Sequence, residues 1–387
     1  MKKQSIKYIP GLLSLLILGL TVNAQRQRGP RIVSPEINKN NSVTFRLLAP
    51  EANKVSISGN WMTGFGTQVE LAKGDSGIWS VTTDVLPPEF YTYSFYVNGV
   101  KTLDLQNPQV VRDGTRFENA VIVPGKESDV YTVKNVPHGI LSKVWYPSPS
   151  LEKNRRMYVY TPPGYDSSNE KYPVFYLLHG AGGDEDAWTT LGRTPYILDN
   201  LIAEGKAKPM IVVMTNGNTW SSAAPGDEPK TEGTPDFSQM ARGGFEKSLV
   251  NDVIPFIEKN YRTLTDKNNR AIAGLSMGGM HTQTITNTNP GKFGYIGVMS
   301  MGLMNNSRWG NYNEEEHKKQ LLALKESGVK LYWIGCGKDD FLYEGVTNLR
   351  KLYDDIGFKY EYMESTGGHT WTNWRIYLSE LAPKLFR

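Results

Sequence analysis

Cysteine is nearly missing from this chain, because Cys336 is the only one among 387 residues. A lone cysteine cannot form an internal disulfide, so the protein is not a small disulfide-stapled scaffold and must depend on its hydrophobic core. Hydrophobic residues are 39% of the chain and charged residues 21%, which supplies enough apolar material for a sizeable core. The length favours two domains.

Long apolar runs are also scarce. The one run covers residues 9–22, behind three lysines and ahead of small residues that end at Ala24. This pattern predicts a signal peptide over residues 1–24, cleaved near Ala24, and therefore a protein exported to the periplasm or the outside of the cell. No second run follows, so we expect no membrane span in the mature chain.

An excess of positive charge is missing once the signal is set aside. The formal net charge is +4, and residues 1–24 carry three lysines and no acid, which leaves +1 (4 − 3). Nothing therefore predicts the clustered basic face that nucleic acid binding needs. We also predict no metal site, because Asp184, Glu185 and Asp186 lack calcium-loop spacing and are expected to cap the following helix.

The rest of the chain shows two sequence patterns, and the first is typical of β-structure. Residues 25–41 are polar and predict a flexible leader. Residues 42–125 hold short stretches of alternating apolar and polar residues between turn signals such as Asn98-Gly99. This pattern predicts an all-β, immunoglobulin-like sandwich.

From residue 126 to 387, apolar runs alternate with helical stretches. Buried parallel strands read as unbroken apolar runs, so this part predicts an α/β fold with the doubly wound sheet of the α/β-hydrolase type. Residues 217–244 lack periodicity and predict a long loop near the site. The expected strands are at 172–178, 210–214, 271–273, 296–299, 331–334 and 358–363, and the clearest helices at 245–260 and 314–326.

The turn Gly274-Leu275-Ser276-Met277-Gly278 carries the predicted nucleophile. A buried strand precedes it and a helix start follows, which is the setting of a nucleophile elbow. The flanking glycines remove side chains that would clash in such a strained turn. We therefore predict that Ser276 is the catalytic serine and that the Met277 N–H points at the oxyanion.

Elimination among the five histidines selects the base. His138 lies between the domains, His179 in a glycine-rich motif, His281 in the helix after the elbow, and His317 in a charged run that predicts a solvated face. His369 remains, in a loop after the last expected strand, where this fold delivers its base.

The acid is expected after the strand at 331–334, where Asp339 and Asp340 are adjacent. We choose Asp340 and keep Asp339 as the alternative. The order Ser276, Asp340, His369 is that of α/β-hydrolases.

A second glycine-rich stretch, residues 179–183, follows the buried strand at 172–178. It is expected to complete the oxyanion hole, with Ala181 as the best single donor. A phosphate-binding loop is a poor alternative, because no Walker lysine follows.

These motifs together resemble carbohydrate esterase family 1, the esterase-D-like group that includes feruloyl and acetylxylan esterases. The resemblance covers residues 141–387 and extends to Gly335-Cys-Gly-Lys-Asp-Asp-Phe-Leu and Gly367-Gly-His-Thr-Trp-Thr-Asn-Trp-Arg. It implies that Asp340 rather than Asp339 is the acid, and that no cofactor is needed.

Residues 42–125 resemble the carbohydrate-binding module of glycogen-branching enzymes. The resemblance rests on Phe45-Arg-Leu-Leu-Ala-Pro, Gly77-Ile-Trp-Ser and Tyr91-Thr-Tyr-Ser-Phe-Tyr-Val-Asn-Gly, which are mainly the structural signature of that module. Two interpretations stay open: the domain binds a glycan, or it walls one side of the esterase pocket.

The combined expectation is a secreted serine esterase that removes feruloyl or other hydroxycinnamoyl groups, or acetyl groups, from plant cell-wall polysaccharide such as xylan. Trp371 is a candidate contact for an aromatic acyl group, with packing behind the His369 loop as its alternative. A siderophore esterase that cleaves catecholate trilactones is the alternative enzyme. A non-catalytic carbohydrate-binding protein is the alternative of another class.

Overall fold

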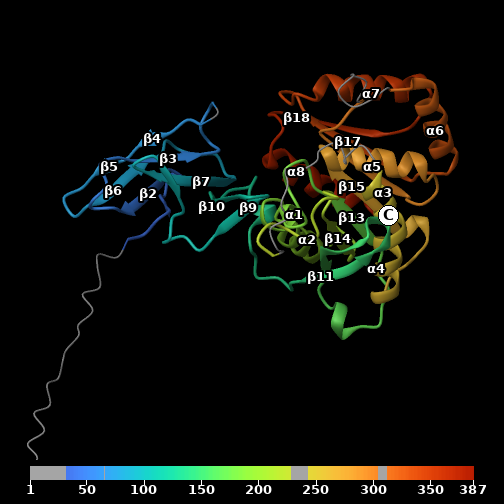
Figure 1. Cartoon of the computed structure of the whole chain (residues 1–387), viewed down its shortest axis with the longest axis horizontal. Helices are drawn as coiled ribbons and strands as arrows, with labels where there is room; N and C mark the ends of the chain where they lie inside the picture. The colour runs from blue at the N-terminus through green and yellow to red at the C-terminus, as the bar shows by residue number, and fades with distance from the viewer. Residues whose placement is uncertain (1–31, 65, 228–242, 304–311) are drawn as a thin grey trace, which may run out of the picture.

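The computed structural model describes residues 32–64, 66–227, 243–303 and 312–387. Figure 1 shows an all-β part that ends at β10 and an α/β part that begins at β11. The predicted signal peptide at 1–24 lies outside the described residues, as does most of the loop predicted at 217–244. Over the described ranges, no helix is long and apolar enough to cross a membrane.

The N-terminal part is a sandwich of two sheets, as predicted. One sheet has the order β1-β2-β6-β5 and the other β4-β3-β7-β10-β9, with β8 paired to β7. Buried side chains such as Phe45, Ile57 and Phe95 form the core of the sandwich. The strands are β1 (Glu36–Ile37), β2 (Val43–Leu48), β3 (Val55–Gly59), β4 (Val69–Glu70), β5 (Ala72–Lys73), β6 (Ile78–Thr82), β7 (Phe90–Val97), β8 (Val100–Thr102), β9 (Val110–Asp113) and β10 (Arg116–Ile122).

Two local predictions for this part have different outcomes. Asn98 and Gly99 form the predicted two-residue turn between β7 and β8, with φ of 49° and 87°. The flexible leader predicted at 25–41 is wrong where the structure describes it. β1 lies in that range and pairs with β2, and the buried Ser34 hydroxyl donates to the Asp104 carboxylate at 2.6 Å. The segment is held on the sandwich by contacts with residues distant in the sequence, and such contacts cannot be predicted from a short polar stretch.

The C-terminal part is built on an eight-stranded sheet of order β11-β12-β14-β13-β15-β16-β17-β18. β12 pairs antiparallel with both β11 and β14, and the remaining neighbours pair in parallel. The strands are β11 (Ile140–Ser148), β12 (Lys153–Thr161), β13 (Val174–Leu178), β14 (Ile211–Thr215), β15 (Arg270–Leu275), β16 (Tyr295–Met299), β17 (Leu331–Gly337) and β18 (Glu361–Ser365).

Helices cover both faces of this sheet, which confirms the doubly wound prediction. Side chains of α1, α2 and α8 share one core cluster and those of α3 to α7 the other, and alternate residues of β13 face the two clusters. The helices are α1 (Ala187–Thr190), α2 (Thr194–Ala203), α3 (Gly244–Ser248), α4 (Ile254–Asn260), α5 (Met277–Thr288), α6 (Glu314–Glu326), α7 (Tyr343–Asp355) and α8 (Trp371–Leu381).

Two features of this part differ from the sequence-based expectation. β11 and β12 escaped prediction because neither is an apolar run: β11 is a largely exposed edge strand, and β12 carries the buried Arg155 and Arg156. The single helix expected over 245–260 is α3, a π-helical turn at Leu249–Val253, and α4.

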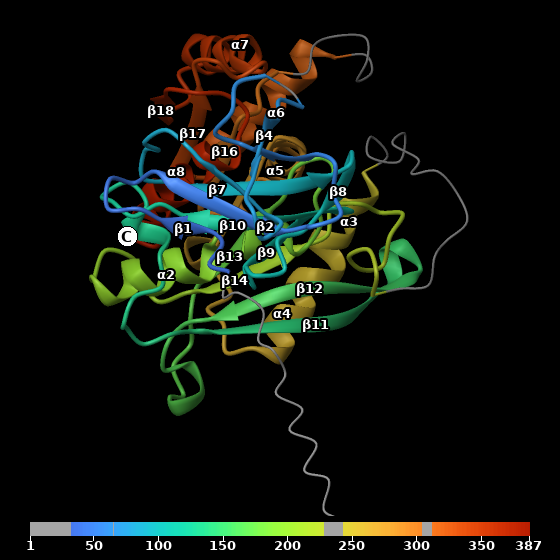
Figure 2. The ribbon, with the colours of Figure 1, turned by 90° about the vertical axis from the view of Figure 1, so that its left-hand side faces the viewer.

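The sandwich and the α/β part share a hydrophobic core. Phe90 and Val111 of the sandwich belong to the same cluster as Trp188 and Trp374 of the α/β part. Figure 2, viewed from the sandwich side, shows the sandwich in front of the α/β part. Because buried apolar side chains cross the boundary, the sandwich is packed onto the α/β part rather than tethered beside it.

Candidate active site

Ser276 lies at a sharp turn between β15 and α5. Its backbone has φ 52° and ψ −119°, a conformation that L-residues rarely adopt, and its N–H donates to the Met299 carbonyl at 2.9 Å. The turn needs glycine at position 278, because a Cβ there would lie 2.5 Å from the Leu178 carbonyl oxygen. This is the geometry of a nucleophile elbow, which raises the hydroxyl above the carboxyl edge of the sheet.

Asp340 and His369 are brought together by the ends of two adjacent strands. Asp340 follows β17 and His369 lies in the loop after β18. His369 Nδ1 is 2.9 Å and 3.0 Å from the two Asp340 carboxylate oxygens. The Asp340 side chain is fully buried, whereas Asp339, the alternative acid, is exposed.

The surroundings of Asp340 favour its charged form. Burial by itself raises the pKa of Asp340, but hydrogen bonds from His369 and from the Leu342 N–H outweigh burial and hold that pKa below its ordinary value. The Leu342 N–H donates to the carboxylate at 2.9 Å. An ionised Asp340 that accepts from Nδ1–H leaves His369 Nε2 free to accept a proton.

Ser276 and His369 both line a pocket of about 250 Å³. No direct hydrogen bond joins these two described side chains, a common situation before substrate draws nucleophile and base together. Trp371 and Trp374 form an aromatic side of the pocket, with ring centroids 5.1 Å apart and planes at 87°. Trp374 also packs edge-on against His369 at 5.0 Å.

The segments of both predicted oxyanion donors border Ser276. Met277 is the first residue of α5, so its N–H has no acceptor within the helix. Ala181 lines the pocket, and a Cβ on the adjacent Gly180 would lie 3.3 Å from Ser276 Cβ. This arrangement can present two backbone donors to one developing negative charge.

His179 connects the glycine-rich loop (residues 180–183) to a neighbouring loop. Its Nε2 accepts from the Gly217 N–H at 2.8 Å, so Nδ1 carries the proton and donates to the Gly180 carbonyl at 2.8 Å. Burial lowers the pKa of His179 to about 4. His179 therefore stays neutral and has a structural role.

The other three histidines lie outside the pocket. His138 Nδ1 is 2.8 Å from the Asp199 carboxylate, and His281 Nδ1 is 2.6 Å from that of Glu246. The solvated position predicted for His317 is wrong: this ring is half-buried beside Tyr312, because α6 packs against α5.

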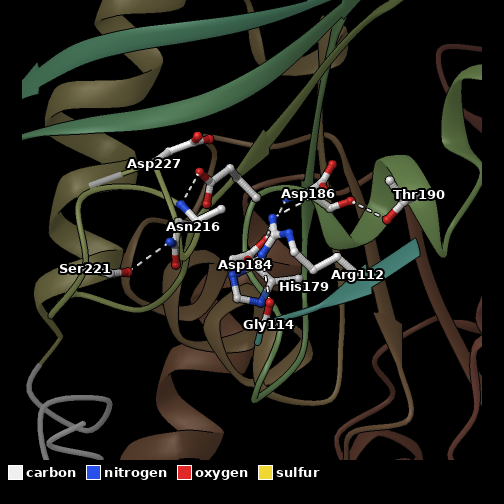
Figure 3. Close-up of polar contacts among 12 residues, drawn as sticks. Arg112, Gly114, His179, Asp184, Asp186, Thr190, Asn216, Ser221 and Asp227 are labelled. Carbon is white, nitrogen blue, oxygen red and sulfur yellow. Dashed lines mark hydrogen bonds and ion pairs between the residues drawn. The ribbon is translucent and has the colours of Figure 1, made fainter. Parts of the chain in front are cut away.

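The acidic cluster after the glycine-rich loop fits the expected helix cap only in part. The Asp184 carboxylate accepts from the Asp186 N–H at 3.0 Å just before α1, whereas Asp186 makes no side-chain cap hydrogen bond. Asp184 and Asp186 also pair with Arg112 of the sandwich, and Glu185 pairs with Arg156. Figure 3 shows the acidic side chains around Arg112. Within the described part of the chain, no group of three or more His, Cys, Asp or Glu side chains is placed to hold a metal ion.

Three residues at the site escaped sequence-based prediction. Phe341 packs against His369 with ring centroids 4.5 Å apart and planes at 48°, and its position directly after the predicted acid could have indicated it. Asp113 and Arg116 line the pocket from the sandwich. They are far from Ser276 in the sequence and belong to another domain, so no local pattern points to them.

Comparison with known proteins places both parts in families. Residues 148–385 match the family model described as "Putative esterase", and residues 22–110 match the one described as "Carbohydrate-binding module 48 (Isoamylase N-terminal domain)". The chain is 36% identical over 360 residues to an endo-1,4-beta-xylanase/feruloyl esterase of Xylanibacter ruminicola. The alignment covers 91% of this chain and 46% of that relative, so the chain spans about half of the longer protein.

Solved structures agree on the architecture. The carbohydrate esterase family 1 ferulic acid esterase of Anaeromyces mucronatus, in complex with ferulic acid, has a TM-score of 0.57 and 26% identity, over 73% of this chain and 98% of that one. The enterobactin esterase of Shigella flexneri has a TM-score of 0.62 over 91% of this chain and 96% of that one. Its identity is 16%, so this second likeness concerns the fold alone.

Proposed function

We propose a function from the premise that this chain belongs to the esterase family matched by residues 148–385, with a family-48 carbohydrate-binding module before it. In this proposal it hydrolyses feruloyl or other hydroxycinnamoyl esters, or acetyl esters, on plant cell-wall polysaccharide such as xylan. The observation that carries the proposal is that His369, which is bonded to the buried Asp340, lines one pocket together with Ser276 and two tryptophans. The name of the Xylanibacter ruminicola relative supports the feruloyl group as the first substrate to test.

The proposed chemistry is acyl transfer through a covalent intermediate. His369 Nε2 takes the proton of the Ser276 hydroxyl as the oxygen attacks the ester carbonyl, while Asp340 stabilises the resulting imidazolium. The N–H groups of Met277 and Ala181 bind the oxyanion, each lowering the barrier by about 3 kcal/mol. The tetrahedral intermediate then collapses: the bond between the acyl carbon and the sugar oxygen breaks, and His369 protonates that oxygen so that the sugar leaves with a free hydroxyl. Water, deprotonated by His369, releases the acid from Ser276 in the same manner.

Replacing the nucleophile tests this proposal. We expect Ser276→Ala to lower kcat on methyl ferulate roughly 10⁴-fold or more, because the hydroxyl proposed to form the acyl-enzyme is removed. Ser167→Ala, at an exposed serine outside the pocket, is the matched control and should keep wild-type kcat. Circular dichroism and thermal unfolding check that both variants fold. Retained hydrolysis by a folded Ser276→Ala variant would refute the serine mechanism.

A substrate panel on the mature protein tests the acyl group and the competing functions. Release of ferulate from methyl ferulate and feruloylated oligosaccharide supports the hydroxycinnamoyl assignment, whereas acetate release from acetylated xylan alone supports an acetyl esterase. Turnover of a catecholate trilactone in preference to both would identify a siderophore esterase instead. Polysaccharide binding without any turnover would identify a non-catalytic binding protein.

Export completes the proposal. Its support is the charged start and apolar run of residues 1–24. Expression of the full chain in a bacterium that secretes proteins, followed by N-terminal sequencing, should yield a mature chain that begins close to Gln25. A chain that keeps residues 1–24 and remains with the cells would contradict export.

A further inference from the structure

We infer that the β9–β10 hairpin of the sandwich forms the polysaccharide-binding wall of the catalytic pocket, where Asp113 and Arg116 hydrogen-bond the sugar that carries the ester. This inference rests on the proposed function and adds to it the position of the sugar. Asp113 ends β9 and Arg116 begins β10, so both flank the turn of the hairpin.

The size of the pocket separates the acyl group from the polymer. Its volume of about 250 Å³ is below the roughly 300–1,000 Å³ of pockets that enclose a whole small-molecule ligand. One acyl group fits such a space, whereas a polysaccharide chain must lie at its mouth. Residues at the mouth therefore meet the sugar.

The pocket is lined by apolar side chains from the α/β part and by charged side chains from the sandwich. Leu275, Trp371 and Trp374 are apolar, whereas Asp113 and Arg116 are charged. The aromatic ring of a hydroxycinnamoyl group packs favourably on indole rings. Sugar hydroxyls require both donors and acceptors, and a guanidinium beside a carboxylate supplies the two together.

The solvent exposure of Asp113 and Arg116 indicates that this charged pair lies at the mouth of the pocket. The Arg116 side chain is 67% exposed and that of Asp113 is 28% exposed, and the Arg116 guanidinium donates to the Asp113 carboxylate. A guanidinium has five N–H donors, and the ion pair uses only part of them. The remaining donors face solvent, where a sugar can replace water.

The hairpin is held firmly against the catalytic machinery (Figure 3). Arg112, the residue before Asp113, donates to both Asp184 carboxylate oxygens, to Asp186 at 3.3 Å and to the Gly114 carbonyl at 2.9 Å. The Arg112 and Asp184 side chains are 11% and 4% exposed, so water screens their ion pair little.

The turn of the hairpin also touches the glycine-rich loop that carries Ala181. A Cβ on Gly114 would lie 2.2 Å from the Gly182 carbonyl oxygen, so the two backbones are in direct contact. A wall fixed in this way binds without first having to be ordered, which favours affinity.

Comparison of two substrates tests the inference. We expect Arg116→Ala to lower kcat/KM about tenfold on a feruloylated arabinoxylan oligosaccharide, mainly through KM, because charge-assisted hydrogen bonds to the sugar are lost. Methyl ferulate, which has no sugar, should be affected much less. Lys101→Ala is the matched control, because Lys101 is an exposed, ion-paired residue of the same sheet outside the pocket.

A binding measurement adds a readout that does not depend on turnover of the sugar ester. The oligosaccharide without its ester should inhibit methyl ferulate hydrolysis, and its inhibition constant should rise about tenfold in Arg116→Ala. Equal losses on both substrates, or no loss on either, would overturn the assignment of this wall to the sugar. A wild-type protein that hydrolyses neither substrate would instead refute the proposed function, and the inference with it.

Discussion

At the scale of single residues, adjacent acids in the chain have opposite surroundings. The side chain of Asp340 is fully buried and bonded to His369, whereas Asp339 is exposed and its backbone N–H donates to the Gly367 carbonyl. Burial together with strong hydrogen bonds lets a carboxylate fix the tautomer of a histidine. This difference supports the role proposed for Asp340.

Two matched variants measure that role. We expect Asp340→Asn to lower kcat on methyl ferulate about 10⁴-fold, because an amide at this position favours the wrong tautomer of His369. Asp339→Asn should change kcat by less than about twofold, as exposed substitutions usually do. Steady-state kinetics on both variants decides between them. A larger loss for Asp339→Asn would reassign the acid.

His179 makes stability depend on pH. Its pKa is lowered from 6.5 to about 4 in the folded protein. Below pH 6.5 the unfolded chain therefore takes up a proton that the folded protein does not. We expect the free energy of unfolding to keep its full value above pH 6.5 and to fall by about 3 kcal/mol as the pH drops to 4.

Urea unfolding at a series of pH values measures this fall. His179→Gln, which removes the titrating ring, should be less stable at pH 7, because the hydrogen bonds to Gly180 and Gly217 are disturbed. The same variant should lose less additional stability between pH 6.5 and 4. An unchanged pH dependence in His179→Gln would assign the effect to other groups.

At the scale of elements, the packing of α5 against β13 and β15 decides the position of Ser276, the proposed nucleophile. α5 starts so close to the end of β13 that position 278 has no room for a side chain. A Cβ there would meet the carbonyl oxygens of Leu178 and His179 at 2.5 Å and 2.6 Å, and neither backbone can move freely. The elbow is therefore a property of three packed elements and not of the turn alone.

Gly278→Ala tests this close packing. We expect a loss of about 3 kcal/mol in the free energy of unfolding and a strong loss of activity, because the clash forces α5 away from the sheet. Gly205→Ala is the control: its φ of 67° is strained for alanine but the space around it is open, so a loss of about 1 kcal/mol is expected. Denaturant unfolding compares them. Similar losses would contradict the clash explanation.

At the scale of the whole molecule, the sandwich and the α/β part are joined by a shared core and a buried ion pair. Arg375 of α8 lies 2.9 Å from the Glu89 carboxylate, and the two side chains are 1% and 13% exposed. Phe90 packs in the same cluster as Trp374. Contacts of this kind couple the unfolding of two domains.

Calorimetry tests the coupling. We expect a single unfolding transition for the wild type, and we expect Arg375→Ala to destabilise it by about 3–5 kcal/mol, because Glu89 loses its cationic partner and keeps only neutral donors from Tyr131 and Phe90. Lys54→Ala, which removes an exposed ion pair with Glu70, should cost less than about 1 kcal/mol. Two separate transitions in the wild type would show that the parts unfold independently.

Local patterns in the sequence determined the two-part architecture, most central strands of the sheet, and the candidates Ser276, Asp340 and His369. These features can be predicted from the sequence because apolar runs, glycine-bounded turns and the order of motifs depend only on residues that are neighbours in the chain. β11 and β12 could not be predicted in this way. The two arginines of β12, Arg155 and Arg156, are buried only because distant loops supply their hydrogen-bond partners. The strand at Glu36–Ile37 was hidden for a similar reason, because its stability comes from pairing with β2.

Only the tertiary structure brought Asp113 and Arg116 to the pocket and Arg112 to Asp184. Their position depends on how one domain packs against another, and the ion pair of Arg112 with Asp184 joins residues far apart in the sequence. The sequence by itself determined the candidate nucleophile, acid and base, because Ser276, Asp340 and His369 each lie in a short motif that is read from neighbours in the chain. The packing of the sandwich against the α/β part decided which surface of the sandwich faces Ser276. Contacts between segments that are distant in the sequence leave no local pattern from which this surface could be predicted.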